Sequence, residues 1–193
     1  MEPDFGTYHH STPKKSQEMR QKIEKIFCPL LLSLHSDDSE LEILDAGCGL
    51  GFMTGIAAKC FPKSRIYAVD VFQHDSLSEA TIEKARSNIK LLGIEYRVGI
   101  VQHDLRVPLD MPERFDLAVS NLVFHNLGKK RFLAYDNVFS VLKPGGYFVI
   151  GDLFPFIKKD MEHFDGMSSA VQERWRDGSG KWSYRIISAR KNE

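Results

Sequence analysis

Short runs of apolar residues alternate along the chain with longer segments in which apolar positions recur every three or four residues. The short runs predict buried strands, and the longer segments predict amphipathic helices. Strands are expected at 41–46, 66–70, 96–102, 116–121 and 147–152. Helices are expected at 16–30, 52–60, 78–92, 129–142 and, with a weaker pattern, 154–169. This alternation predicts an α/β fold of the Rossmann-like, doubly wound type, with a mostly parallel sheet and helices on both faces.

The last forty residues depart from this alternation. Two segments with strand composition, 171–176 and 182–189, flank the sequence Asp-Gly-Ser-Gly at 177–180. Glycine and aspartate between two strand-like segments are typical of a hairpin turn. We therefore expect an antiparallel C-terminal hairpin at one edge of the sheet.

The segment 41–51 has the strongest functional pattern in the chain. Its apolar run ends in Asp45 and continues into Gly47, Gly49 and Gly51, after which a helix is expected. Glycines suit such a turn because they adopt positive φ angles and let a ligand approach the backbone closely. The N–H groups at the start of the following helix add hydrogen-bond donors and a partial positive charge. The segment therefore favours a nucleotide or a carboxylate as ligand.

A second acid strengthens this interpretation. Asp70 ends the next apolar run, 19 residues after Gly51. An acid at the tip of the second strand, about 20 residues beyond such glycines, can accept hydrogen bonds from the hydroxyl groups of a ribose. The glycine turn and Asp70 together predict a nucleoside site.

Length and composition narrow the class of protein. A chain of 193 residues can bury a core as one domain, and its 26 basic and 26 acidic side chains leave no excess charge for gripping a nucleic-acid backbone. Cys28, Cys48 and Cys60 lack the number and spacing of a disulfide framework or a zinc site, so no metal is expected. Neither a membrane span of ~18 apolar residues nor a signal peptide is evident. We expect a single intracellular, cytoplasmic domain over 1–193.

The first residues allow two interpretations. Residues 1–15 combine glycine, prolines and polar groups, with Tyr8, His9 and His10 among them, and predict an irregular arm. The arm can be a mobile terminus, or it can fold over the nucleotide site and become ordered when ligand binds. In the second case the arm and the helix after it, 1–40, form a lid.

Five motifs in this order resemble those of the class I S-adenosylmethionine-dependent methyltransferases. They extend over 41–152 and are specific as a set, although none is specific alone. The motifs are the glycine segment with its preceding acid at 44–51, Val-Asp at 69–70, Gln-His-Asp-Leu at 102–105, the fourth strand at 115–121 and Val-Leu-Lys-Pro-Gly-Gly at 141–146. Dinucleotide dehydrogenases usually carry glycine or an apolar residue where Asp45 stands, which disfavours a nicotinamide cofactor.

The resemblance implies S-adenosylmethionine as cofactor and S-adenosylhomocysteine as product. It implies that Asp70 binds the ribose and that Asp104 meets the adenine amino group, although an aspartate there can also cap a loop or a helix. Phe72 can stack on the adenine or simply pack into its loop. The cofactor-contacting positions that the resemblance implies are Asp45, Gly47, Gly49, Gly51, Asp70, Val71, Phe72, Asp104, Leu105 and Asn121.

The acceptor is less defined than the cofactor. The Asn/Asp-Pro-Pro-aromatic signature of many methyltransferases that act on bases or glutamine is absent, because Ser-Asn-Leu-Val stands at 120–123. The compact chain and the balanced charge favour a small-molecule acceptor. One alternative is a protein or RNA acceptor, which would need a substrate groove of one charge sign. Another is a methyltransferase-like binding or scaffold protein without turnover.

Methyl transfer from a sulfonium is an in-line displacement, so alignment of nucleophile, methyl group and sulfur can supply ~7–11 kcal/mol of the catalysis. An oxygen or ammonium acceptor that must lose a proton also needs a base. His125, just past the fourth strand, titrates near neutrality and is the candidate for that role. A histidine beside Asn126 and Gly128 can equally be a loop or capping residue.

Overall fold

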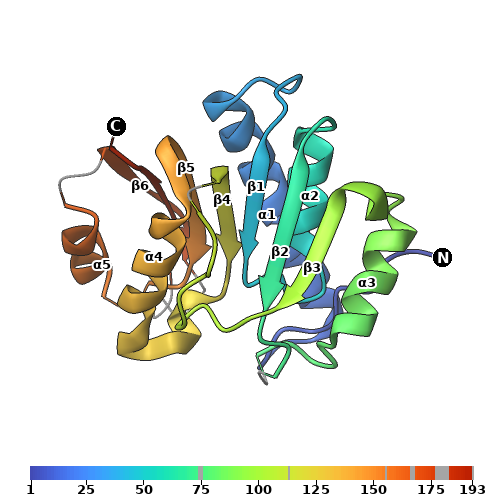
Figure 1. Ribbon diagram of the computed structural model, residues 1–193. Coiled ribbons are helices and arrows are strands. Elements are labelled where there is room, and N and C mark those ends of the chain that lie inside the picture. The colour runs from blue at the N-terminus through green and yellow to red at the C-terminus, as the bar shows by residue number, and fades with distance from the viewer. Residues whose placement is uncertain (74–75, 113, 155, 166–167, 177–182, 193) are drawn as a thin grey trace. The chain divides into compact units, whose positions relative to one another are not determined.

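The computed structural model describes residues 1–73, 76–112, 114–154, 156–165, 168–176 and 183–192. The chain divides into two compact units, Met1–Asp104 and Leu105–Glu193. Unit 1 contains α1 (Pro13–Leu34), β1 (Glu42–Ala46), α2 (Phe52–Cys60), β2 (Arg65–Asp70), α3 (Ile82–Leu91), the 3-10 turn η1 (Glu95–Arg97) and β3 (Val98–Gln102) (Figure 1). Unit 2 contains β4 (Phe115–Asn121), the 3-10 segment η2 (Phe124–Lys130), α4 (Arg131–Ser140), β5 (Leu142–Asp152), α5 (Ile157–His163), β6 (Ser168–Arg176) and β7 (Ser183–Arg190).

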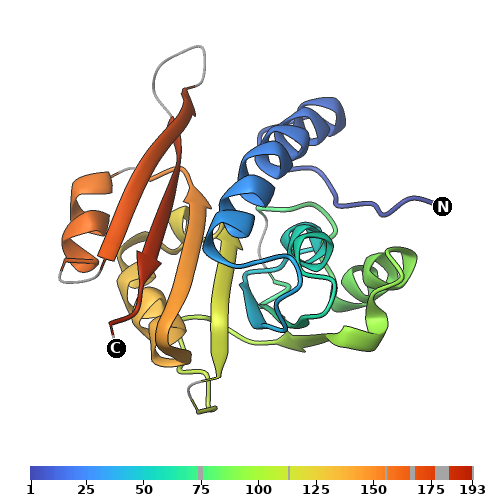
Figure 2. The same cartoon turned by 90° about the horizontal axis from the view of Figure 1, so that it is seen from above.

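Unit 1 is a parallel three-stranded sheet with helices packed against it. The strand order is β3-β2-β1; Asp45 of β1 pairs with Ala68 of β2, and Asp70 of β2 pairs with Gln102 of β3. Helices α1 and α2 pack side by side, and α3 packs against β3 (Figures 1 and 2). Because these strands are parallel and in register, the residues that follow all three of them lie at one edge of the sheet.

Unit 2 pairs β4 and β5 in parallel and then adds two antiparallel strands. The order is β4-β5-β7-β6; Asn121 of β4 pairs with Gly151 of β5, which in turn pairs with Ile186 of β7. Strands β6 and β7 are antiparallel to each other, as predicted, while the predicted turn at 177–180 lies outside the described residues. The predicted α/β class, with mostly parallel strands and an antiparallel C-terminal pair, is confirmed.

Apolar positions of the sequence pattern fill both cores. In unit 1, Phe27 of α1 and Leu44 of β1 are fully buried, and in unit 2 Tyr135 of α4 and Phe148 of β5 are fully buried. Burial of each side chain of this size contributes roughly 1.5–3 kcal/mol to folding. None of the helices within the described ranges is long and apolar enough to cross a membrane.

Helix α1 is longer than the sequence pattern predicted. It begins at Pro13, where the Thr12 hydroxyl accepts a hydrogen bond from the Lys15 N–H, and it continues beyond Pro29 to Leu34. Proline inside a helix usually kinks or ends it because it removes one backbone donor. The buried apolar face of the helix includes Leu31, and its packing holds the last turn in place.

Three other elements differ from the pattern at their ends. Helix α3 begins at Ile82 instead of 78, because the Thr81 hydroxyl accepts from the Lys84 N–H and caps it there. The helix predicted at 129–142 is observed as α4, which begins only at Arg131; the preceding segment η2 extends to Lys130 and is kinked at Gly128, whose φ is +56°. Helix α5 is shorter than the weak pattern at 154–169 indicated.

Strand β5 begins earlier than predicted. The segment 143–146, which separates the helix expected to end at 142 from the strand expected to begin at 147, is part of the strand, which starts at Leu142. Gly145 adopts a φ of +76°, and the register between β4 and β5 shifts between Phe115 and Leu117. Glycine can adopt the backbone conformation that this register shift requires. The Gly145 N–H donates to the Lys191 carbonyl, and the Lys191 N–H, after β7, donates to the Gly146 carbonyl.

Candidate functional site

The loop between β1 and α2 has the backbone conformation that its glycines allow. Gly47, Gly49 and Gly51 have φ angles of +86°, +50° and +89°, which residues with a side chain rarely adopt. The N–H groups of Gly47 and Cys48 both donate to the Val69 carbonyl at 2.8 and 2.9 Å, which ties the loop to β2. Helix α2 starts directly after Gly51, so the loop leads into a helix N-terminus.

Asp70 lies at the carboxyl end of β2 and connects three loops. Its Oδ2 accepts from the Gly49 N–H at 2.9 Å, and its Oδ1 accepts from the Phe72 N–H at 2.8 Å. Its carbonyl accepts from the His103 N–H at 2.9 Å. Each carboxylate oxygen has a further lone pair that can accept from a ribose hydroxyl. The predicted ribose acid is therefore fixed in place by the glycine loop.

Asp45, at the end of β1, has an unusual electrostatic environment. The side chain is fully buried; Oδ2 accepts from the Thr54 hydroxyl at 2.6 Å, whereas Oδ1 has no hydrogen-bond partner among the described residues. Burial, together with the negative charge of Asp70, raises the pKa of Asp45 to about 7 although the Thr54 hydrogen bond opposes the shift. A buried carboxylate oxygen without a partner favours a cationic group, such as the ammonium group of S-adenosylmethionine.

The other predicted residues of unit 1 lie at the same edge. Phe72 is half-buried and adopts a φ of +52°, and strained backbone of this kind concentrates at functional sites. The Gln102 side chain donates to the Val71 carbonyl at 2.9 Å, and Asp104 lies two residues beyond the end of β3. Unit 1 thus brings together Asp45, Gly47, Gly49, Gly51, Asp70, Val71, Phe72 and Asp104. Unpartnered Asp45 Oδ1, the Asp70 carboxylate and the positive-φ glycines fit S-adenosylmethionine.

The N-terminal arm is docked on unit 1. Tyr8 forms an antiparallel bridge with Leu77, in the loop after β2. On either side of this bridge the Ser78 N–H donates to the Thr7 carbonyl at 3.1 Å, and the His9 N–H donates to the Ser76 carbonyl at 2.9 Å. This loop starts from Asp70, so the arm lies along the loop that carries the candidate ribose acid.

In unit 2, His125 is paired with Asp152, an acid at the end of β5. The imidazole Nδ1 lies 2.5 Å from Asp152 Oδ1, and the backbone N–H groups of Phe124 and His125 donate to Asp152 Oδ2 at 2.8 and 3.1 Å. The side chain of Asp152 is 1% exposed and that of His125 is 25% exposed. Burial lowers the pKa of His125, but the hydrogen bond and the charge of Asp152 outweigh it, so the pKa is raised overall.

The remaining predicted positions also lie in unit 2. Asn121, the last residue of β4, accepts a hydrogen bond at its Oδ1 from the Tyr184 hydroxyl at 2.6 Å. Leu122 after it has a φ of +59°, so Phe72 after β2 and Leu122 after β4 both have a positive φ in the loops that follow parallel strands. Leu105 is buried, and its carbonyl accepts from the Asn137 side chain at 2.8 Å. Contact of Asn121 and Leu105 with a cofactor stays a prediction.

Sequence reasoning missed two polar partners of the candidate residues. Asp152 has the same signal as Asp45 and Asp70, an acid at the end of an apolar strand, so the rule that found those acids could have found it. Tyr184 carries no such signal, because an aromatic residue in a C-terminal strand is expected to pack in the hydrophobic core. In the described part of the chain, no group of three or more His, Cys, Asp or Glu side chains is placed to hold a metal ion.

Sequence comparisons point to the same family. A family model described as "Methyltransferase domain" matches residues 37–187. A malonyl-[acyl-carrier protein] O-methyltransferase from Priestia megaterium is 32% identical over 115 residues, which are 60% of this chain and 38% of the relative. A ribosomal RNA small subunit methyltransferase C from Serratia proteamaculans is 37% identical over 97 residues, which are 50% of this chain and 25% of the relative. The chain thus spans well under half the length of these relatives.

The fold is also found in solved structures. That of an S-adenosylmethionine-dependent methyltransferase from Mesorhizobium loti has a TM-score of 0.66 at 19% identity, and the match covers 84% of this chain and 96% of the other. At this identity the likeness shows the fold alone, while the family model covers most of the chain. The chain therefore belongs to the methyltransferase domain family, whose class I members take their methyl group from S-adenosylmethionine.

Proposed function

We propose that this chain transfers the methyl group of S-adenosylmethionine to a small-molecule acceptor and that His125 accepts the proton which the acceptor loses. The observation that carries the proposal is the His125–Asp152 pair in unit 2, because a structural loop histidine needs no buried carboxylate behind its ring. The candidate cofactor-binding residues of unit 1, which include Asp45, Asp70 and the loop glycines, support a methyl-transfer reaction.

The cofactor, when bound, supplies a methyl group on a positively charged sulfur. In unit 1, Asp70 would hold the ribose and Asp45 the ammonium group, while the loop glycines let the ligand approach the backbone. Asp104, Val71 and Phe72 would surround the adenine side. These residues bind and orient; they donate or accept no proton in the transfer itself.

The proton step depends on the orientation of His125. Asp152 accepts from Nδ1, which leaves Nε2 as the basic nitrogen of the neutral ring. Nε2 has no hydrogen-bond partner in the ranges that the structure describes, so it is available to an acceptor hydroxyl or ammonium group. Nε2 would take up the proton that the acceptor loses, while bound S-adenosylmethionine would supply the methyl group. A charged imidazolium forms, and the Asp152 carboxylate stabilises it.

A polymeric acceptor is the competing proposal. One relative methylates a malonyl group on an acyl-carrier protein and another acts on ribosomal RNA, so the family includes carrier-bound and RNA acceptors. The balanced charge of this chain, with 26 basic and 26 acidic side chains, favours the small molecule. A protein that binds the cofactor without turnover is the third possibility.

The test combines binding with turnover. Titration calorimetry with S-adenosylmethionine, S-adenosylhomocysteine and NAD measures whether the adenosyl ligands bind selectively. Release of S-adenosylhomocysteine is then followed with a panel of phenols, carboxylic acids and amines, and separately with a total RNA preparation and an acyl-carrier protein. Turnover on a panel compound supports the proposal; turnover only on RNA or the carrier protein, or binding without any turnover, overturns it.

A further inference from the structure

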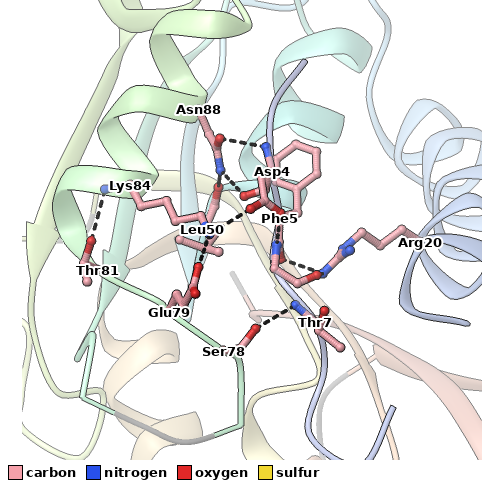
Figure 3. A network of polar contacts seen from close by, with 11 residues as sticks. Asp4, Phe5, Thr7, Arg20, Leu50, Ser78, Glu79, Thr81, Lys84 and Asn88 are labelled. Atoms are coloured by element: carbon pink, nitrogen blue, oxygen red, sulfur yellow. Dashed lines mark hydrogen bonds and ion pairs between the residues drawn. The ribbon is translucent and has the colours of Figure 1, made fainter. Parts of the chain in front are cut away.

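Asn88 of α3 joins the N-terminal arm to the glycine loop (Figure 3). The residue is only 2% exposed, although it is polar and lies on a helix. Its Nδ2 donates to the Leu50 carbonyl in the glycine loop at 2.9 Å and to the Asp4 carbonyl in the arm at 2.8 Å. Its Oδ1 accepts from the Asp4 N–H at 3.0 Å. One buried amide therefore holds both segments, with both of its N–H bonds in use.

Arg20 of α1 holds the next part of the arm. Its Nη2 donates to the Phe5 and Gly6 carbonyls at 2.5 and 2.7 Å, and its guanidinium carbon lies 4.6 Å from the centre of the Tyr8 ring. Arg20 itself is 5% exposed, so these hydrogen bonds are shielded from water. The ion pair of Lys84 with Asp4, at 2.8 Å, is more exposed and adds less. Buried hydrogen bonds to the backbone, more than surface charge, hold the arm.

Gly6 lets the arm approach the loop at backbone contact distance. Its φ is +71°, and a Cβ built there would lie 2.9 Å from the Ser78 carbonyl oxygen and 3.0 Å from Leu50 Cδ1. A side chain at this position would therefore need the arm to move away from both segments. The arm is fitted to the glycine loop and to the loop that starts at Asp70.

We propose that docking of the arm and binding of the cofactor are coupled through Asn88, which acts as a positioning residue for Leu50 in the glycine loop. The proposal rests on the proposed use of S-adenosylmethionine by unit 1. With the arm docked, two hydrogen bonds to Asp4 fix the Asn88 amide, and the amide fixes the Leu50 carbonyl between Gly49 and Gly51. When the arm is released, Asn88 loses its hydrogen bonds to Asp4. The glycine loop then loses its fixed geometry. Coupling of this kind is reciprocal, so bound cofactor must also favour the docked arm.

Hydrogen exchange of this chain tests directly whether bound ligand favours the docked arm. The amides of Asp4, Thr7 and His9 all donate within this docked arrangement. Saturating S-adenosylhomocysteine is expected to slow their exchange roughly fivefold or more, the lower end of typical coupling. Unchanged exchange with the ligand bound would overturn the coupling. Absence of ligand binding to the wild-type protein would instead overturn the proposed function, and the coupling with it.

Two variants test whether the docked arm favours binding of the ligand. Gly6→Ala alters only the arm, and Asn88→Ala removes the connecting amide; both are expected to weaken S-adenosylhomocysteine binding by roughly fivefold or more. Arg97→Ala is the matched control, because Arg97 also donates to backbone carbonyls of unit 1, those of Ala58 in the last turn of α2 and of Phe61 and Ser64 after it. It is expected to lower the thermal midpoint and leave the affinity unchanged. Wild-type affinity in a folded Gly6→Ala protein with faster arm exchange would refute the proposal.

Discussion

His125 and Asp152 contact each other through both backbone and side chain: Nδ1 of the ring lies 2.5 Å from Oδ1, and the backbone N–H of His125 donates to Oδ2 at 3.1 Å. The double contact fixes the imidazole relative to β5. It also sets the ring tautomer, because the nitrogen that faces the carboxylate carries the proton. These are the properties that a general base needs before an acceptor arrives.

Replacement of the base should affect turnover and spare the cofactor. His125→Asn is expected to lower kcat by roughly 10²–10⁴-fold with an acceptor that must lose a proton, while the Kd for S-adenosylhomocysteine stays unchanged. His163→Asn is the control, since His163 in the same unit also contacts a carboxylate, that of Asp136 at 2.9 Å, but this carboxylate is 63% exposed, whereas that of Asp152 is buried. Equal rates for His125→Asn and the wild type would remove His125 from the mechanism.

The pH dependence of turnover should report the same pair. Because Asp152 raises the pKa of His125, kcat/KM is expected to rise with pH through a pKa above the ordinary value of about 6.5 for histidine. Asp152→Asn removes the negative charge and should move this pKa downward while it lowers the rate at its plateau. A pH profile with the same midpoint in both proteins would show that the histidine is not the titrating group.

The contribution of His125 to folding stability should decrease as the pH rises, whereas kcat/KM should increase. The folded-state pKa of His125 lies above its unfolded value, so protonated His125 stabilises the fold fully below about pH 6.5, and this contribution is lost as the pH rises through the folded pKa. The difference in unfolding free energy between wild type and His125→Asn should therefore be larger at pH 5.5 than at pH 9. Urea denaturation at both pH values measures it, and a difference that grows with pH would contradict the assignment.

Replacement of Asp45 should increase folding stability and weaken cofactor binding. Its pKa of about 7 lies above its unfolded value of about 4, so the ionised form is disfavoured in the fold and stability falls as the pH rises between these values. Asp45→Asn should raise the unfolding free energy at pH 8 by roughly 1–3 kcal/mol, because it removes a buried charge. It should also weaken S-adenosylmethionine binding by about tenfold or more, since the ammonium group loses its carboxylate. Unchanged affinity in this variant would show that Asp45 does not face the ligand.

The placement of Asp45, the three glycines and Asp70 at one edge of unit 1 was largely predictable from the sequence. The run before Asp45 and the run before Asp70 both have strand composition, and parallel strands place the residues after them at one edge. Glycines at 47, 49 and 51 define the turn because few other residues adopt its φ angles. Local chemistry and strand periodicity therefore sufficed for this part.

The contacts that join distant segments were not predictable in the same way. Asn88 has the sequence appearance of any polar helix position, and only the tertiary fold shows that it is buried against Leu50 and Asp4. The arm contains glycine, prolines and polar residues, a composition that does not distinguish a free terminus from one docked by backbone hydrogen bonds. The pairing of His125 with Asp152 depends on the register of β4 against β5, which no short pattern encodes.

The most direct measurement of the central claim is calorimetric titration of the folded wild-type protein with S-adenosylmethionine and S-adenosylhomocysteine, with NAD as comparison. Micromolar binding of both adenosyl ligands and no binding of NAD is predicted, because Asp45 and Asp70 flank a loop that suits an adenosyl amino acid. Absence of binding by either adenosyl ligand to the folded protein would contradict the account.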